Sequence, residues 1–184
     1  GVDAEYCTDI RVANCDIYEC SQGGVQFRGT KGIVMENNTL RDLAGSDMDF
    51  IDCKDVTVNG ETLISADISN SLIIQSEYQQ DLQALDRFVT EFANAYFYGD
   101  TQTLSAGLSK DYTGGVEAYS GNTNDVIVCW HEVTLDMWKE ADANGTYEFA
   151  YPYRENVDSE IAYLTIVVVR ENDAWKVSSY SLAE

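Results

Sequence analysis

Three stretches near the start of the chain decide its fold, because they repeat one another without a gap: CTDIRVANCDIYECSQGGVQF at residues 7–27, TKGIVMENNTLRDLAGSDMDF at 30–50 and CKDVTVNGETLISA at 53–66. Successive copies are offset by 23 residues. Their apolar residues alternate along each copy, which is the period of a β-strand. The aligned columns are Ile10–Ile33–Val56, Val12–Met35–Val58, Ile17–Leu40–Leu63, Cys20–Leu43–Ala66, Val25–Met48 and Phe27–Phe50.

Turn-forming residues keep the same register as the apolar columns. Asn14 aligns with Asn37, and Asp9 aligns with Gly32 and Asp55. A short repeat with alternating apolar residues, polar corners and no helical stretch is typical of one rung of a parallel β-solenoid. We therefore predict about three rungs over residues 1–70, followed by a connector or cap at 71–77 whose SLII segment pairs as an irregular last rung.

The segments DIRVANCDIYEC, GIVMENNTLRDL and DVTVNGETLI resemble the rungs of right-handed parallel β-helix proteins, the pectate-lyase-like solenoids. This resemblance covers about the first third of the chain and implies architecture more than activity. Carbohydrate-cleaving members carry their catalytic residues on the outside of a longer helix, and these rungs offer no matching cluster. Because the first rung follows Gly1 at once, we expect the natural solenoid to continue upstream.

The net charge narrows the choice of partners. The chain has 32 acidic and 11 basic residues, which gives a formal charge of −21. Such a surface repels polyphosphate, so we expect no nucleic-acid partner. The acidic residues are scattered and form no calcium-loop motif, and we predict neither a metal nor a cofactor. No apolar run is long enough for a membrane span.

The repeat accounts for most of the cysteines. Cys7 and Cys53 stand two rungs apart, about 10 Å, which is beyond the reach of a disulfide. We expect both to be free thiols packed as small core residues. A bond between Cys15 and Cys20 stays open, and Cys129 is expected alone in a strand.

The pattern changes at Tyr78, and we predict a second, α+β domain over 78–184. Apolar residues spaced by three and four predict a helix over 79–98 that ends at Gly99, then a short helix capped by Asp100 or Thr101. Alternation predicts a long strand over 127–137, and DANG at 142–145 predicts a hairpin. Further strands are expected over 161–170 and 175–182.

The segments FVTEFANAYFYGDTQTLSAGLS and YLTIVVVRENDAWKVSSYSL, with this order of elements, are similar to the NTF2-like superfamily. The resemblance covers about 105 residues. It implies a curved antiparallel sheet that wraps a long helix into a cone, and a homodimer through the outer face of the sheet.

A group of tyrosines with the single histidine forms the candidate site. His131 is expected on the inner side of its strand, with Glu132 and Asp136 pointing away, so the imidazole lacks a carboxylate for catalysis and we predict no catalytic residue. The expected ligand-binding residues are Tyr96, His131, Tyr147, Tyr151, Tyr153 and Tyr163, which would line a cavity. The alternative is a sheet packed on its helix with hydroxyls at the rim. Trp130 and Trp138 are expected together on the opposite, dimer-forming face, and Trp175 in the core.

These observations favour a non-catalytic binding or interaction module of an exported or cell-surface protein, with a carbohydrate or another protein as its ligand. Two alternatives stay open. One is a small-molecule isomerase or hydrolase that uses His131 with a tyrosine. The other is the end of a polysaccharide-cleaving β-helix enzyme whose active rungs lie upstream.

Overall fold

The computed structural model describes residues 1–182. The chain divides into two compact units, Gly1–Asp81 and a second unit that starts at Leu82. Each unit is described by itself below.

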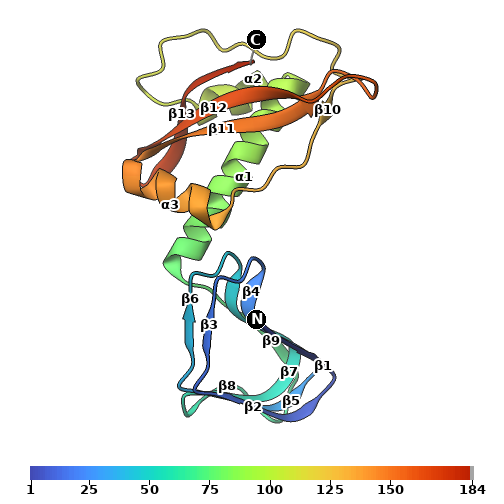
Figure 1. The fold of residues 1–184 in the computed structure, drawn as a ribbon, viewed down its shortest axis with the longest axis vertical. Helices are drawn as coiled ribbons and strands as arrows, with labels where there is room; N and C mark the ends of the chain where they lie inside the picture. The colour runs from blue at the N-terminus through green and yellow to red at the C-terminus, as the bar shows by residue number, and fades with distance from the viewer. Residues whose placement is uncertain (183–184) are drawn as a thin grey trace. The chain divides into compact units, whose positions relative to one another are not determined.

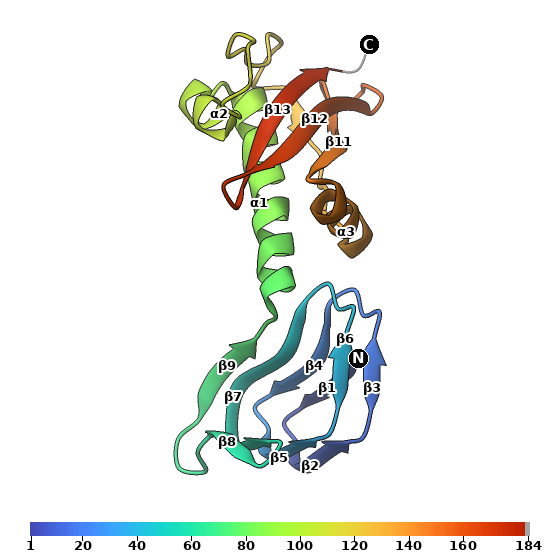
Figure 2. The ribbon, with the colours of Figure 1, turned by 90° about the vertical axis from the view of Figure 1, so that its left-hand side faces the viewer.

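The N-terminal unit is a coil of parallel strands with three walls (Figures 1 and 2). One wall contains β1 (Val2–Glu5), β4 (Gly23–Arg28) and the first half of β7 (Ser46–Val58). The second contains β2 (Thr8–Ala13), β5 (Lys31–Glu36) and the second half of β7, and the third pairs β3 (Asp16–Tyr18) with β6 (Thr39–Arg41). Paired residues in these parallel ladders are 23 positions apart, as the repeat predicts.

The predicted columns stack as expected in the core of this coil. Ile10 lies opposite Ile33, and Ile33 lies opposite Val56. Phe27 and Phe50 are fully buried, with stacked rings whose centroids are 6.0 Å apart. Similar side chains of successive rungs therefore stack on one another, and this stacking excludes water from the interior.

The corners of the coil repeat a backbone conformation as well as a residue type. Left-handed φ values recur at 23-residue intervals at Tyr6, Gly29 and Asp52, at Asp9, Gly32 and Asp55, at Asn14 and Asn37, and at Glu19 and Asp42. Gly, Asn and Asp reach this region most easily, which explains the aligned polar positions in the sequence. At Gly32 an added Cβ would lie 2.7 Å from Asp9 Oδ1, a side-chain atom that can move away, so the φ of +71° is what favours glycine there.

The last repeat does not complete a parallel rung, which corrects the predictions for Leu63 and Ala66. Asn59 and Gly60 both have positive φ and form a tight turn. β8 (Glu61–Ile64) then returns antiparallel to β7 instead of stacking on β6. β9 (Asn70–Ile74), which contains SLII, also pairs with β7, and it too runs antiparallel. The Asn–Gly pair is a strong hairpin signal that overrides the 23-residue register.

The cysteines are free thiols. Cys53 is fully buried, as predicted, whereas Cys7 is partly exposed, because it precedes β2, the last strand at one end of the sheet order within residues 1–182. Cys15 and Cys20 form no bond with each other. Cys129 lies just beyond a two-residue strand and not inside a long one.

The helices of the C-terminal unit follow the predicted start and stop signals at first. α1 (Glu77–Tyr98) ends before Gly99, whose φ is +78°. α2 (Thr101–Gly107) is capped by Asp100, whose carboxylate accepts a hydrogen bond from the Thr103 amide. None of the helices within residues 1–182 is both long and apolar enough to cross a lipid bilayer.

The predicted strand over 127–137 and hairpin at 142–145 are wrong. β10 (Ile127–Val128) is short, and α3 (Leu135–Asn144) occupies the rest of the region. Thr134 caps α3 through a hydrogen bond from the Met137 amide, and Gly145 ends it with φ at +66°. A left-handed glycine serves a helix end as well as a hairpin turn, so this signal fits both structures.

A four-stranded antiparallel sheet completes this unit, in the order β10, β11 (Thr146–Arg154), β12 (Ala162–Glu171) and β13 (Ala174–Leu182). The turn between the last two strands is formed by Asn172 and Asp173. The inner face buries Phe149, Tyr151, Tyr153, Leu164, Ile166, Val168, Trp175 and Val177. Figure 2 shows this sheet beside α1. A curved antiparallel sheet with helices is thus present, and Trp175 belongs to its core as predicted.

Candidate functional site

Two of the predicted tyrosines lie together in an aromatic chamber, which we define as Tyr96, Phe97 and Tyr153. Tyr96 and Phe97 come from the last turns of α1, and Tyr153 comes from the end of β11. The Tyr153 ring centroid lies 4.6 Å from that of Phe97, and the Tyr96 centroid lies 5.1 Å from it. All three residues are less than 8% exposed. Burial raises the pKa of the Tyr96 and Tyr153 hydroxyls, so both carry their protons at neutral pH.

His131 lies in a second place, next to Tyr151. Its ring centroid is 5.1 Å from that of Tyr151 and 6.2 Å from that of Phe149. The segment that carries it is irregular, and the residue is half-buried. Burial is the largest effect and lowers the pKa of His131, so the imidazole is neutral at pH 7. A neutral imidazole beside a protonated phenol can donate and accept hydrogen bonds without a net charge.

Asp86 is the functional candidate that the sequence reasoning missed. Its Oδ1 accepts a 2.7 Å hydrogen bond from the Val133 amide, and its charge partly opposes the lowering of the His131 pKa. Thr90, one helical turn further along α1, accepts a 3.4 Å hydrogen bond from the Tyr151 hydroxyl. The helical spacing of Asp86 and Thr90 was the available signal, because residues four apart share one face of a helix. Within residues 1–182, no hydrogen bond joins the imidazole to a carboxylate.

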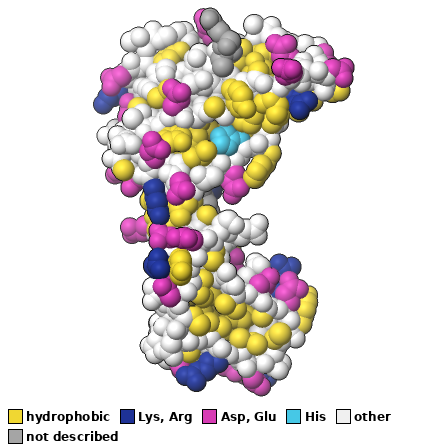
Figure 3. Space-filling model, in the orientation of Figure 1, with side chains coloured by type: hydrophobic (Ala, Val, Ile, Leu, Met, Phe, Trp, Pro, Cys, Tyr) yellow, Lys and Arg dark blue, Asp and Glu magenta, His cyan; other side chains and the backbone are white. Residues whose placement is uncertain are grey.

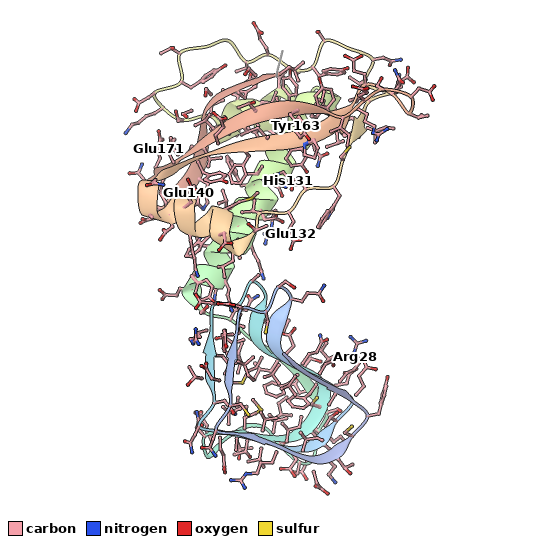
Figure 4. All side chains as sticks on the ribbon, viewed as in Figure 1. Arg28, His131, Glu132, Glu140, Tyr163 and Glu171 are labelled. Atoms are coloured by element: carbon pink, nitrogen blue, oxygen red, sulfur yellow. The ribbon has the colours of Figure 1, made fainter. Side chains whose placement is uncertain are left out.

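Tyr147 and Tyr163 do not join either group. Tyr147 packs on Phe149, with centroids 4.6 Å apart, farther along β11 from the chamber. Tyr163 lies on the opposite face of the sheet and is 44% exposed, because it precedes the buried Leu164 and side chains alternate along a strand. Figure 4 labels Tyr163 on β12 and His131 on the segment after β10. The expectation that all six residues line one cavity is therefore wrong.

The outer face of the sheet instead carries an apolar patch, which we define as Ile127, Pro152, Ile161 and Tyr163. Register places Tyr163 opposite Pro152 and Ile127 opposite Arg154, so these four residues share a face and one end of the sheet. Ile161 lies two residues before Tyr163, just before β12 begins. Ile127, Ile161 and Tyr163 are 40%, 47% and 44% exposed. Figure 3 shows hydrophobic side chains next to His131, which itself contacts the inner-face residues Phe149 and Tyr151.

The two tryptophans expected on this face lie elsewhere. Trp130 is 82% exposed in the irregular segment before His131, and Trp138 is on α3. They were expected to alternate along one strand, and they separate because that strand ends at Val128.

No cation site is formed by the described residues. Within residues 1–182, no three His, Cys, Asp or Glu side chains gather closely enough to hold a metal ion. The described side chains around His131 can therefore offer hydrogen bonds and apolar contacts.

The comparisons with known proteins concern the N-terminal unit. Residues 1–82 match the family model described as the right handed beta helix region. No curated protein and no solved structure matches the chain significantly. This similarity to right-handed β-helices agrees with the parallel ladders and their 23-residue register.

Proposed function

We propose that the chain is a non-catalytic binding or interaction module of an exported or cell-surface protein, and that it binds through the apolar patch. The observation that carries this proposal is the exposure of Ile127, Ile161 and Tyr163 on one face of a chain with a net charge of −21. Exposed apolar residues grouped on one surface are typical of an interaction site. The C-terminal unit is proposed to be NTF2-like, which its long helix and curved sheet support.

The composition of the patch favours a protein partner over a carbohydrate. Two isoleucines and a proline provide aliphatic contact area with few hydrogen-bonding groups, whereas sugars need polar partners as well as flat rings. A second copy of the chain is the partner that we propose first. Two copies that each carry a net charge of −21 repel one another, and the patch contains no acidic residue, so it is where two copies can approach at the lowest electrostatic cost.

Sedimentation velocity on the full chain tests this proposal. The wild type should form a dimer that strengthens as salt is added, because salt screens the repulsion between two acidic chains. The double variant Ile127→Ser with Tyr163→Ser should stay monomeric. The matched control is Ile73→Ser with Tyr98→Ser, which removes side chains that are 62% and 56% exposed elsewhere. A monomeric wild type that binds glycans, with binding lost only in the patch variant, would favour the carbohydrate instead.

A second candidate is a small-molecule isomerase or hydrolase. It is favoured by one observation, the effect of the Asp86 charge on His131 beside the Tyr151 hydroxyl. A histidine with a carboxylate nearby is a suitable general base once a substrate draws the groups together. Turnover of any member of a broad substrate panel by the wild type, lost in His131→Ala, would establish this function. A folded His131→Ala variant with unchanged ligand binding, and no turnover by the wild type, would exclude it.

A further inference from the structure

A long segment without helix or strand covers one end of the aromatic chamber. We call residues 110–125, between α2 and β10, the strap. Most of its residues are exposed, and only Tyr112, Ala118 and Tyr119 are partly buried. Gly114, Gly115 and Gly121 lie on either side of Tyr119, so the backbone there can change direction easily.

Two tyrosines of the rest of the unit hold the middle of the strap. The Tyr180 hydroxyl on β13 accepts a 2.9 Å hydrogen bond from the Glu117 amide and donates one of 2.9 Å to the Glu117 carbonyl. The Tyr119 amide donates a 2.9 Å hydrogen bond to the carbonyl of Tyr96. Within the described chain, these three bonds are the ones that tie residues 113–121 to other elements. A single side-chain hydroxyl therefore accounts for two of them.

Tyr119 closes the chamber with its own ring. The Tyr119 centroid lies 5.4 Å from Phe97, 6.1 Å from Tyr153 and 6.4 Å from Tyr96. The chamber residues belong to a helix and a strand, whereas Tyr119 belongs to an exposed, irregular segment. The chamber residues are thus held in place by secondary structure. The Tyr119 ring is the part that can move out without unfolding the helix or the strand.

We propose that the strap is a gate with Tyr119 as its plug and Tyr180 as its latch, over a site that takes a single aromatic ring bearing one polar group. The present occupant is itself a phenol, so the walls already fit such a ring in offset and edge-on contacts. Tyr96 and Tyr153 are the wall residues whose hydroxyls can act as its polar partners. An external ligand of this class would compete with Tyr119 for the same place. The site is separate from the apolar patch, and its test does not depend on the function proposed above.

The probe is p-cresol, the side-chain analogue of tyrosine, added to the full chain. In Tyr119→Ala the plug is removed, and p-cresol should bind at least about tenfold more tightly than to the wild type, since it regains the lost ring contacts. Isotope-filtered NMR should then show the probe next to the rings of Tyr96 and Tyr153. Tyr98→Ala, which removes a tyrosine ring that is 56% exposed and lies outside the chamber, is the matched control and should bind p-cresol as the wild type does.

The role of Tyr180 as the latch is tested by amide hydrogen exchange. Tyr180→Phe removes two hydrogen bonds to Glu117 but leaves the bond of the Tyr119 amide to Tyr96 untouched, so exchange of the Tyr119 amide reports opening of the whole gate. We expect it to exchange about tenfold faster, with amides of β12 unchanged. Wild-type exchange of that amide in Tyr180→Phe would overturn the proposal. A folded Tyr119→Ala variant that binds p-cresol no better than the wild type would also overturn it. If Tyr119→Ala does not fold, the amide exchange of Tyr180→Phe alone decides between the outcomes.

Discussion

The Val133 amide donates a hydrogen bond to Asp86 Oδ1, and this bond fixes the segment that carries His131 against α1. The two residues are 47 positions apart in the sequence. The bond is partly buried, which limits competition from water, and it holds the segment in a position where the imidazole lies close to Tyr151. The position of the His131 segment is therefore set by its contact with α1 and not by the long strand that alternation predicted.

Asp86→Asn should lower the pKa of His131 further. Burial already lowers this pKa, and the Asp86 charge is the largest opposing effect. Asparagine keeps an oxygen for the Val133 amide but removes the charge that favours the imidazolium. An NMR titration follows the ring protons without ambiguity, because the chain has one histidine. Glu148→Gln, on the exposed side of β11, should leave the titration unchanged. A higher His131 pKa in Asp86→Asn would show that the carboxylate does not act on the ring as described.

The stability of the C-terminal unit should fall as the pH drops below the ordinary pKa of histidine, about 6.5. The folded-state pKa of His131 is depressed, so the unfolded chain binds the proton first. The stability that depends on a neutral His131 is fully present above about pH 6.5. It is lost as the pH falls through the folded-state pKa of this residue. Urea unfolding at pH 7.5 and 5.5 should show a smaller decrease for His131→Gln than for the wild type. Since carboxylates titrate equally in both proteins, equal decreases would contradict this account.

The coil of the N-terminal unit could be predicted from the sequence because its contacts repeat at a fixed interval. Ile10, Ile33 and Val56 stand in one column, and each column confirms the register of the next. The end of the coil could not be predicted in the same way. The Asn59–Gly60 turn belongs to no column, and a local turn with both residues at positive φ reverses the chain before Leu63 can stack.

The same dipeptide explains the largest error in the C-terminal unit. Asn144–Gly145 reads as a hairpin, yet Gly145 ends α3. A glycine at positive φ fits both structures, so the choice is made by the residues before it, where Thr134 caps a helix and Ala141 is fully buried. Asp86 was missed for a related reason. Its partner lies on another element, and a pattern within one segment carries no information about which elements meet.

Ile33→Ala should destabilise the coil by about 2–5 kcal/mol, the usual cost of truncating a fully buried isoleucine. Ile33 is 0% exposed and lies between Ile10 and Val56, so no neighbour on either side can move in to fill the space. Val34→Ala is the matched control, because Val34 is the next residue on the same strand and faces the other way. Chemical denaturation of both variants measures the difference. Equal losses would mean that the two faces of β5 are not distinguished by burial.

Thr134→Ala tests whether α3 begins where the structure places it. The Thr134 hydroxyl accepts a 3.3 Å hydrogen bond from the Met137 amide, which would otherwise have no partner within the helix. Loss of such a cap costs about 0.5–2 kcal/mol, so the urea midpoint of the C-terminal unit should decrease. Thr134→Ser retains the hydroxyl and should restore most of the stability. In a long strand over this region, Thr134 would have no capping role, and serine would stabilise no better than alanine. Equal midpoints for the alanine and serine variants would therefore contradict α3 and return the segment to the strand that its alternating pattern predicts.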